Sequence, residues 1–309
     1  MPKNVLENAY SLIISSAVKR VVAGFRDNRK FLKYPLLSMI KMAFFKAPWN
    51  MRLKDGSQKS IKDYNEFFRE RFKYLHKDSY LDDASGSYII KRNKDGKLVK
   101  LKLLNNGDIF RAFVNEDYSW LPVNGQIVLD VGCSIGDSSI FSAMEGAEKV
   151  YAYEPFPYSF QMAKYNVEQN GYGNVIEIIN EGVGKSGEIS IDPNFISTNS
   201  SKLLAHTSPN GLKVRVKSLN EIVEKIGSST IVMKMDCEGC EYNLLDEDNS
   251  VLAKFSQIQI EYHYGCKRLV KKLENAGFNV RCTKARKVLD SGFTNPKLQV
   301  GWIFAARPQ

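Results

Sequence analysis

Two carboxylates and two cysteines share the stretch MKMDCEGCEY, which covers residues 233–242. Asp236 and Glu238 follow the apolar run IVMKM, and Cys237 and Cys240 have the spacing of a CxxC motif. Carboxylates at the end of a buried strand can take up a proton, whereas a CxxC pair can bind zinc or exchange electrons. The stretch therefore offers either an acid–base site or a metal or redox site.

The rest of the chain gives the cysteine pair little support. A structural zinc site needs four ligands, and the sequence has no second CxxC and no HxxxH. The cysteines number five, and no apolar signal-peptide core precedes them, which favours free thiols in a reducing, cytoplasmic compartment. No apolar run approaches the roughly 20 residues of a membrane span. We expect no bound metal and interpret the carboxylates as the site.

His263 is a third candidate for the same chemistry. It is one of only three histidines and ends the run FSQIQIEYH, which predicts a strand. The carboxyl ends of parallel strands meet at one edge, so we expect His263 near Asp236 and Glu238. A single histidine is more often structural, and Glu238 could instead stabilise the start of the next helix. Lys234 and Glu261 fit either a buried ion pair or the site.

Alternating strands and helices must position these residues. Strand-like runs are separated by helical patterns from residue 126 onward, which predicts an α/β, doubly wound, mostly parallel seven-stranded sheet. No helix separates the last two runs, so we expect a terminal antiparallel hairpin. The runs are QIVLDVG, KVYAYEP, NVIEIIN, STIVMKMD, FSQIQIEYH, FNVRC and QVGWIFAA, and the helices are expected over 135–145, 156–170, 218–226, 239–247 and 267–276.

The first 120 residues have a different character. Residues 1–50 hold nine Lys or Arg against two acidic residues, which is +7 of the chain's +10, and their apolar residues have helical spacing. A helix is expected over 60–76, and a β-hairpin over 87–104 turns at Asp95-Gly96. The predicted domains are a helical basic extension (1–60), an accessory helix and hairpin (61–120) and the α/β domain (121–309).

The turn after the first long strand, LDVGCSIG, is suited to a nucleotide. Gly132 and Gly136 allow close backbone approach to a ligand at a helix start, and Glu154 follows at the end of the second strand, where an acidic residue can bind ribose hydroxyls. The spacing is not the GxGxxG of dinucleotide sites. The run EGVGKSG (181–187) resembles a phosphate loop, but Ile179 stands where its first glycine belongs, and a strand, EISI, follows.

These motifs carry a family resemblance. VLDVGCSIGDSSIFSAMEGAEKVYAYEP is similar to the first motifs of class I S-adenosylmethionine-dependent methyltransferases, specifically the FkbM family. VKSLNEIV, IVMKMDCEGCEYNLL and QIQIEYH resemble that family's later motifs, and IFRAFVNEDYSW resembles the segment before its first strand. The likeness covers roughly 88–306. Cys133-Ser134, Asn220 and Cys237 depart from the family's usual Ala-Asn, Asp and Val, but none removes a charge from the site.

The resemblance implies the cofactor S-adenosyl-L-methionine, held across the carboxyl ends of the first three strands. It assigns the amino-acid portion to the glycine turn and the ribose to Glu154, and it gives Glu181 the adenine side. Asp236, Glu238 and His263 would hold the acceptor hydroxyl and its proton. The turn residues carried over are Asp130, Gly132, Cys133, Ser134, Ile135 and Gly136.

The predicted function is O-methylation of a hydroxyl on a sugar, glycan or other polyhydroxylated small molecule. The sequence pI of about 9.2 leaves RNA methylation as an alternative, although enzymes that methylate base amines tend to have Asn/Asp-Pro-Pro-aromatic where this chain has DCEG. A catalytically inactive cofactor-binding protein is the other alternative. Residues 5–46 are expected to form two amphipathic helices, packed on the protein itself or resting on an anionic membrane.

Overall fold

The computed structural model describes residues 28–75, 79–82, 84–92, 94–103, 111–113, 116–192, 210–228, 230–285 and 299–308. The chain forms two compact units, residues 1–80 with 289–295, and residues 81–288 with 296–309. The three-part division at residues 60 and 120 remains a prediction. The helix expected within the first 27 residues lies outside the described residues.

The first unit is a small helical and β structure. Its described elements are α2 (Pro35–Phe44), β1 (Trp49–Arg52), β2 (Gln58–Ile61) and α3 (Tyr64–Leu75), with β1 and β2 antiparallel. Pro35 begins α2, where its missing N–H is not needed, and the Trp49 indole donates a hydrogen bond to the Phe45 carbonyl at 2.8 Å. The second of the two helices expected within residues 5–46 is present as α2. The helix expected over 60–76 is present as α3, although residues 60 and 61 belong to β2. The core comprises Phe31, Leu32, Met39, Met42, Trp49, Met51, Leu53, Ile61 and Phe67.

The expected hairpin is also present. β4 (Ser87–Lys91) and β5 (Leu98–Leu101) pair antiparallel, and β3 (Tyr80–Asp82) completes a three-stranded sheet. Asn166 and Asn170 hold the hairpin against the rest of the second unit, because their side-chain oxygens accept hydrogen bonds from the backbone N–H groups of Lys102 and Lys100 at 2.8 and 2.9 Å.

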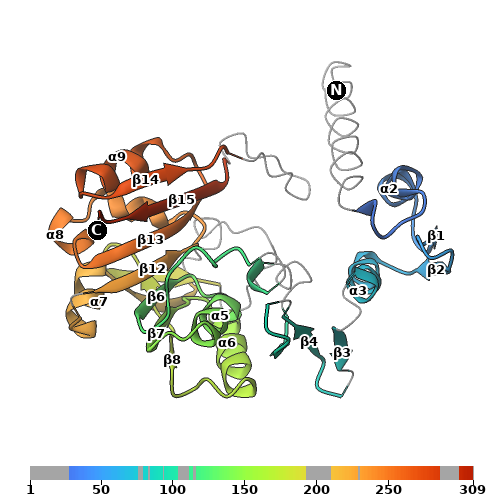
Figure 1. The fold of residues 1–309 in the computed structure, drawn as a ribbon, viewed down its shortest axis with the longest axis horizontal. Coiled ribbons are helices and arrows are strands. Elements are labelled where there is room, and N and C mark those ends of the chain that lie inside the picture. The colour runs from blue at the N-terminus through green and yellow to red at the C-terminus, as the bar shows by residue number, and fades with distance from the viewer. Residues whose placement is uncertain are drawn as a thin grey trace. The chain divides into compact units, whose positions relative to one another are not determined.

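The second unit contains the predicted seven-stranded sheet (Figure 1). In order across the sheet, its strands are the third, second, first, fourth, fifth, seventh and sixth along the chain, with only β15 antiparallel to its neighbours β13 and β14. This confirms the predicted fold class, including the terminal antiparallel pair. The strands are β6 (Ile127–Val131), β7 (Lys149–Tyr153), β8 (Ile176–Ile179), β12 (Ile231–Met235), β13 (Phe255–Tyr262), β14 (Asn279–Cys282) and β15 (Gly301–Ala306).

Helices and a small second sheet complete this unit (Figure 1). The helices are α5 (Asp137–Met144), α6 (Pro157–Gln169), α7 (Leu219–Ile226), α8 (Asn249–Leu252) and α9 (Lys267–Asn275). β9 (Gly182–Val183), β10 (Gly187–Ile191) and β11 (Leu212–Lys217) form the second sheet, so a strand follows EGVGKSG as expected. Among the described residues, no helix combines the length and the apolar character that crossing a membrane requires.

The two faces of the central strands differ in polarity. One face carries residues such as Leu129, Met233 and Ile260, which share a core with α7, α8 and α9. Successive side chains point to opposite faces of a strand. Asp130 and Lys234, register partners on β6 and β12, therefore lie on the opposite face, and so does Glu261 of β13. All three are buried, so the sheet presents a row of charges that require partners.

Candidate active site at the carboxyl edge of the sheet

The glycine turn connects β6 to α5 and packs against the residue that follows β12. Gly132 has φ +74°, and a Cβ at this position would lie 2.1 Å from the carbonyl oxygen of Asp236. Only glycine permits both this conformation and this approach. Gly136, with φ +82°, ends the turn and begins α5. The sequence therefore places the backbone of the proposed cofactor loop directly against the residue that opens the DCEG segment.

Asp130 lies inside the protein beneath this turn. Its carboxylate is 2.9 Å from the Lys234 ammonium and accepts hydrogen bonds of 2.6 Å from the hydroxyls of Ser138 and Ser139. Lys234 also donates to the Gly132 carbonyl at 2.7 Å. Burial would lower the pKa of Lys234, but Asp130 and Asp236 outweigh burial and raise it. Lys234 is thus charged, and its contacts with Asp130 and with the Gly132 carbonyl hold the turn in place.

Glu154 lies where β7 ends, as predicted. Its two carboxylate oxygens accept backbone N–H groups from Ser134 at 2.9 Å and from Phe156 at 3.0 Å. Burial raises the pKa of Glu154 to about 7 despite these hydrogen bonds. Each oxygen retains a second lone pair that can accept a ligand hydroxyl. Of the other turn residues, Cys133 and Ile135 are fully buried and point into the core, so they would contribute backbone rather than side chain.

Cofactor affinity should depend on the charge of Glu154. Glu154→Ala should weaken S-adenosylmethionine binding by about 1–3 kcal/mol, the usual cost of a lost polar contact. The ionised carboxylate is the better acceptor, and its pKa is about 7. In wild type the affinity should therefore rise between pH 6 and pH 8. Calorimetry at several pH values should show no rise in S-adenosylmethionine affinity for Glu154→Gln. The control variant Glu181→Gln should show the same rise as wild type. A Glu154→Gln variant with the wild-type pH dependence would contradict the assignment of the ribose to Glu154.

Glu181 lies two residues beyond the end of β8. It is partly exposed, and its carboxylate is 3.3 Å from the Lys217 ammonium. This ion pair faces the same edge of the sheet as Glu154. The adenine-side role remains a prediction.

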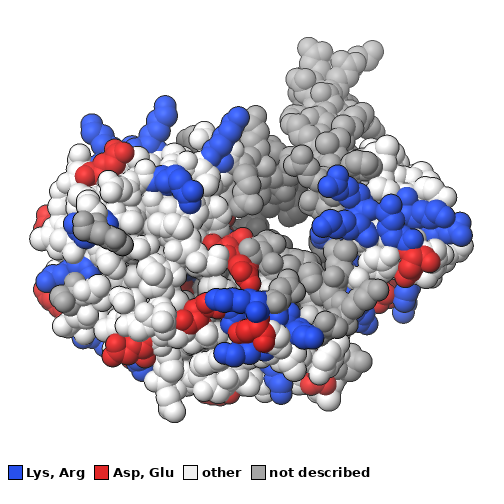
Figure 2. Space-filling model, viewed as in Figure 1, with Lys and Arg blue, Asp and Glu red and all other residues white. Residues whose placement is uncertain are grey.

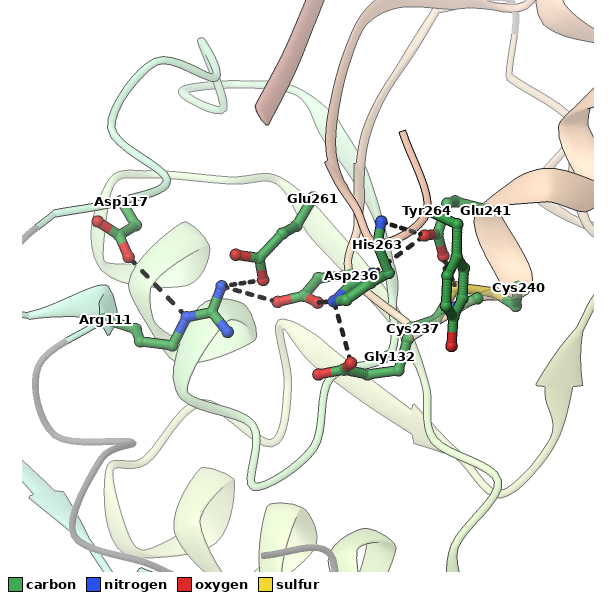
Figure 3. Close-up of polar contacts among 12 residues, drawn as sticks. Arg111, Asp117, Gly132, Asp236, Cys237, Cys240, Glu241, Glu261, His263 and Tyr264 are labelled. Atoms are coloured by element: carbon green, nitrogen blue, oxygen red, sulfur yellow. Dashed lines mark hydrogen bonds and ion pairs between the residues drawn. A yellow bond between two sulfur atoms is a disulfide. The ribbon is translucent and has the colours of Figure 1, made fainter. Parts of the chain in front are cut away.

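Arg111 joins two carboxylates that come from different strands (Figure 3). Its Nη2 lies 3.0 Å from Asp236 Oδ2 and 2.5 Å from Glu261 Oε2, and its Nε lies 3.9 Å from Asp117. The guanidinium also stands 5.7 Å from the centre of the Trp302 ring. A single cation thus gathers the ends of β12 and β13 at the edge of the glycine turn.

His263 is held between two further carboxylates. Its Nε2 lies 3.0 Å from Glu238, and its Nδ1 lies 3.0 Å from Glu241, which is completely buried. Asp236 Oδ1 is 3.9 Å from Nε2. Burial would lower the pKa of His263, but Glu238 and Glu241 raise it to about 11. His263 is therefore an imidazolium at neutral pH and acts as a fixed positive charge rather than as a proton acceptor.

The neighbouring carboxylates Asp236 and Glu261 have opposite pKa shifts. Burial would raise the pKa of Asp236, but Arg111, Lys234 and His263 lower it below its ordinary value. Burial and the charge of Asp236 raise the pKa of Glu261 to about 7. A hydrogen bond also links the two side chains. One carboxylate stays ionised while the other exchanges a proton near neutral pH, a pattern that marks acid–base sites.

Asp236, Glu261 and His263 also have the composition of a metal site. One ligand atom from each lies within 4.8 Å of the others. However, Arg111 already contacts both carboxylates, and an imidazolium has no lone pair for a metal. A metal could bind only if His263 lost its proton and Arg111 withdrew.

The cysteines differ from the expectation of free thiols. Cys237 is paired with Cys240, with a Cα–Cα distance of 5.5 Å, and Cys266 is paired with Cys282. Among the described residues only Cys133 is free. The expectation was therefore wrong for four cysteines, because spacing does not reveal which side chains the fold brings together. The disulfide between Cys237 and Cys240 closes the loop that carries Glu238. The cysteines of the CxxC motif therefore constrain the backbone that positions this carboxylate.

Two members of this site were not assigned from the sequence. Arg111 lies within IFRAFVNEDYSW, where nothing about its spacing singles it out. Glu241 falls in the α-helix expected over 239–247. The structure has a short 3₁₀ helix over Cys240–Leu245 instead, preceded by Glu238 (φ +59°) and Gly239 (φ +128°), both in left-handed conformations. The one sequence signal for Glu241 was its place as the third carboxylate within six residues that begin at Asp236.

The residues at this edge suit a cationic cofactor that carries hydroxyls. Carboxylates end β7 and β12, and the turn from Gly132 to Gly136 presents backbone at a helix N-terminus. Glu154 would hold the ribose, and Asp236 would lie beside the sulfonium.

Residues 130–280 match the family described as the methyltransferase FkbM domain. Shorter similarities reach protein arginine N-methyltransferase 1 of Oryza sativa subsp. indica, with 47% identity over 66 residues, which is 21% of this chain and 16% of that protein. Ribosomal protein arginine N-methyltransferase rmt3 of Schizosaccharomyces pombe is 27% identical over 158 residues, covering 45% of this chain and 27% of that protein. The chain thus spans less than a third of the length of these curated relatives.

Solved structures with related folds are distant. A ribosomal protein L11 methylase from Lactobacillus delbrueckii subsp. bulgaricus has a TM-score of 0.38 and 17% identity, and covers 70% of this chain and 88% of its own. Magnesium protoporphyrin IX methyltransferase from Synechocystis PCC 6803, solved with bound S-adenosylmethionine, has a TM-score of 0.37 and 15% identity, and covers 69% and 86%.

Proposed function

Because this chain carries a methyltransferase FkbM domain over residues 130–280, we propose that it transfers a methyl group from S-adenosyl-L-methionine to a hydroxyl of a sugar, glycan or other polyhydroxylated small molecule. The domain match confirms the family, and with it the enzyme class and the cofactor that the motifs indicated. The identity of the acceptor is our proposal, and one observation carries it. The Asp236–Glu261 pair, with pKa values displaced in opposite directions, lies against the glycine turn.

The acceptor hydroxyl must lose a proton as it is methylated. Glu261, with a pKa of about 7, is the group best matched to receive that proton at neutral pH. Asp236 remains ionised and is held by Arg111, so it can accept a hydrogen bond from the acceptor and orient its oxygen. The bound cofactor supplies an electrophilic methyl group. A neutral acceptor hydroxyl needs this help, because its own pKa is far above 7.

Glu238 and His263 form the outer wall of the site in this proposal. Glu238 is partly exposed while its partner His263 is buried, so the carboxylate can contact an acceptor from a fixed position. Glu241 holds the imidazolium from the other side and acts as a positioning residue. In this proposal Asp236 and Glu238 keep their predicted place beside the acceptor, His263 becomes a fixed positive charge rather than a proton acceptor, and Glu261 takes the proton.

The acceptor can be identified with the whole protein. Purified protein would be incubated with S-adenosylmethionine carrying a labelled methyl group and, separately, with mixed glycans, lipid-linked sugars, RNA and protein. We expect label in an alkali-stable methyl ether of the glycan or lipid-linked sugar fractions. Asp236→Asn protein, which should still bind the cofactor, is the control for label carried over without turnover.

Label in RNA or in arginine side chains would overturn the acceptor assignment while keeping the enzyme class. Cofactor binding without label in any fraction would favour the inactive cofactor-binding alternative. An untargeted comparison of methylated glycans and lipids in cells with and without the protein provides an independent test.

A further inference from the structure

The first unit exposes an unusual cluster of large apolar side chains on and beside α2. Among the described residues, eleven large hydrophobic side chains are exposed, and five of them fall within residues 34–45. Leu37, Phe44 and Phe45 are 52%, 55% and 64% exposed. Soluble surfaces normally carry such residues singly. The complete cluster is Tyr34, Leu36, Leu37, Phe44 and Phe45, which we call the α2 surface.

The cluster lies on and beside α2, which has apolar side chains on two faces: one face is buried in the core of the unit, and the other is exposed. Met39 and Met42 pack into the core of the unit and fix α2 in place. Leu37, Lys41 and Phe44 are spaced by four and three residues, so they form a stripe on the face that is not packed into this core. The indole of Trp49 and the hydroxyl of Tyr64 hydrogen-bond to the carbonyls of Phe45 and Met42, which anchors the end of the helix. These contacts fix the orientation of α2, so the stripe of Leu37, Lys41 and Phe44 faces away from the core of the unit.

The part of the chain that carries the α2 surface is strongly basic. Residues 28–75 contain twelve Lys or Arg against four Asp or Glu, a net charge of +8. Figure 2 shows Lys and Arg gathered on this unit. The acidic side chains are engaged locally: Glu70 pairs with Lys59 and Lys73, and Glu66 accepts the Lys62 N–H. The flanking cations, which form no ion pair with a described residue, are Arg29, Lys30, Lys33, Lys41 and Lys46.

We propose that the α2 surface docks on an anionic phospholipid bilayer, with its apolar side chains in the interface and its flanking cations on the lipid phosphates. An interfacial helix needs this combination of Leu or Phe on one face with Lys or Arg beside it. A phosphate groove for RNA would have no use for five exposed apolar side chains. The docking holds whether or not the proposed methyl acceptor is correct.

Vesicle co-sedimentation of the full chain tests the proposal. Phosphatidylcholine vesicles with about 30% phosphatidylserine should bind the protein at low salt, and phosphatidylcholine alone should not. Each basic residue at an anionic surface contributes roughly fivefold in partitioning. Lys33→Glu with Lys46→Glu should therefore reduce binding by about 25-fold or more, and Leu37→Ser with Phe44→Ser by at least tenfold. Added salt should release the wild-type protein.

Matched controls lie on the second unit. Lys213→Glu removes an exposed lysine, and Leu98→Ser removes an exposed leucine. Both should leave vesicle binding and S-adenosylmethionine affinity unchanged. The α2 variants should keep that affinity, which reports on the second unit, and should keep the wild-type far-UV circular dichroism and protease resistance of residues 28–75, which show that the first unit is folded.

Three results would overturn the proposal. They are no binding to anionic vesicles at low salt, equal loss in the control variants, and a wild-type dimer that Leu37→Ser with Phe44→Ser converts to a monomer. The last would make the α2 surface a subunit interface. Binding to single-stranded RNA that the lysine variants weaken, with no vesicle binding, would assign the charge to nucleic acid instead.

Discussion

Asp236→Asn should lower kcat for methyl transfer by about 10²–10⁴-fold, a far larger effect than its effect on the S-adenosylmethionine Kd. General acid–base groups typically contribute a factor of this size. The substitution removes the negative charge that Arg111 contacts and that raises the pKa of Glu261, but it leaves the Asp236 backbone that packs against Gly132. Single-turnover kinetics and calorimetry measure the two quantities separately.

The pH profile distinguishes a proton acceptor from a merely structural carboxylate. Glu261 has a pKa of about 7, so wild-type kcat should rise as pH increases through 7. The charge of Asp236 raises the pKa of Glu261, and that of His263 lowers it. The rising limb should therefore move to lower pH in Asp236→Asn and to higher pH in His263→Ala. Glu261→Gln should lose the limb altogether.

Two comparisons guard this interpretation. Glu188→Gln alters an exposed carboxylate paired with Lys213, and it should leave kcat and its pH profile unchanged. His263→Ala leaves Glu241 buried with only backbone partners, so it should be paired with Glu241→Gln to relieve that charge. Full activity in both Asp236→Asn and Glu261→Gln, or limbs that move in the same direction, would reassign the chemistry to other residues.

The strands of the site were predictable because their signal is local. Runs such as IVMKM and QIQIEY are apolar enough to be buried on both faces, and each is followed directly by an ionisable residue, Asp236 or His263. The shared carboxyl edge of parallel strands then brings Asp236 and His263 together without knowledge of the loops. Glu154 was found in the same way from the end of the second strand.

The remainder of the site depends on contacts between distant parts of the chain. Arg111 meets Asp236 across 125 positions of sequence, and the residue pattern around it does not indicate the direction of its side chain. The protonation of His263 follows from Glu241, whose approach follows the left-handed conformations of Glu238 and Gly239. Cysteine pairing likewise depends on folded distances rather than spacing. Charges were predictable as candidates, but their partners and pKa shifts were not.

Lys234→Met should destabilise the second unit by about 3–5 kcal/mol. Both Lys234 and Asp130 are almost fully buried, and their nitrogen and oxygen lie 2.9 Å apart. Removal of one member of a buried ion pair leaves the other charge uncompensated, and this costs far more than removal of both. Urea unfolding at pH 7.5, followed by tryptophan fluorescence, measures the loss. Lys213→Met, on an exposed lysine, should change stability by less than about 0.5 kcal/mol.

A second substitution separates the structural role of this pair from its role in cofactor binding. Asp130→Asn combined with Lys234→Met should regain most of the lost stability, because the buried charge is gone and Ser138 and Ser139 can still hydrogen-bond to the amide. Lys234→Met should also weaken cofactor binding, because the Gly132 carbonyl loses the hydrogen bond from the Lys234 ammonium that holds the turn. The double variant should bind the cofactor equally weakly. A double variant less stable than Lys234→Met would show that Asp130 stabilises the fold without its partner. A double variant with full affinity would show that the turn keeps its shape without the ion pair.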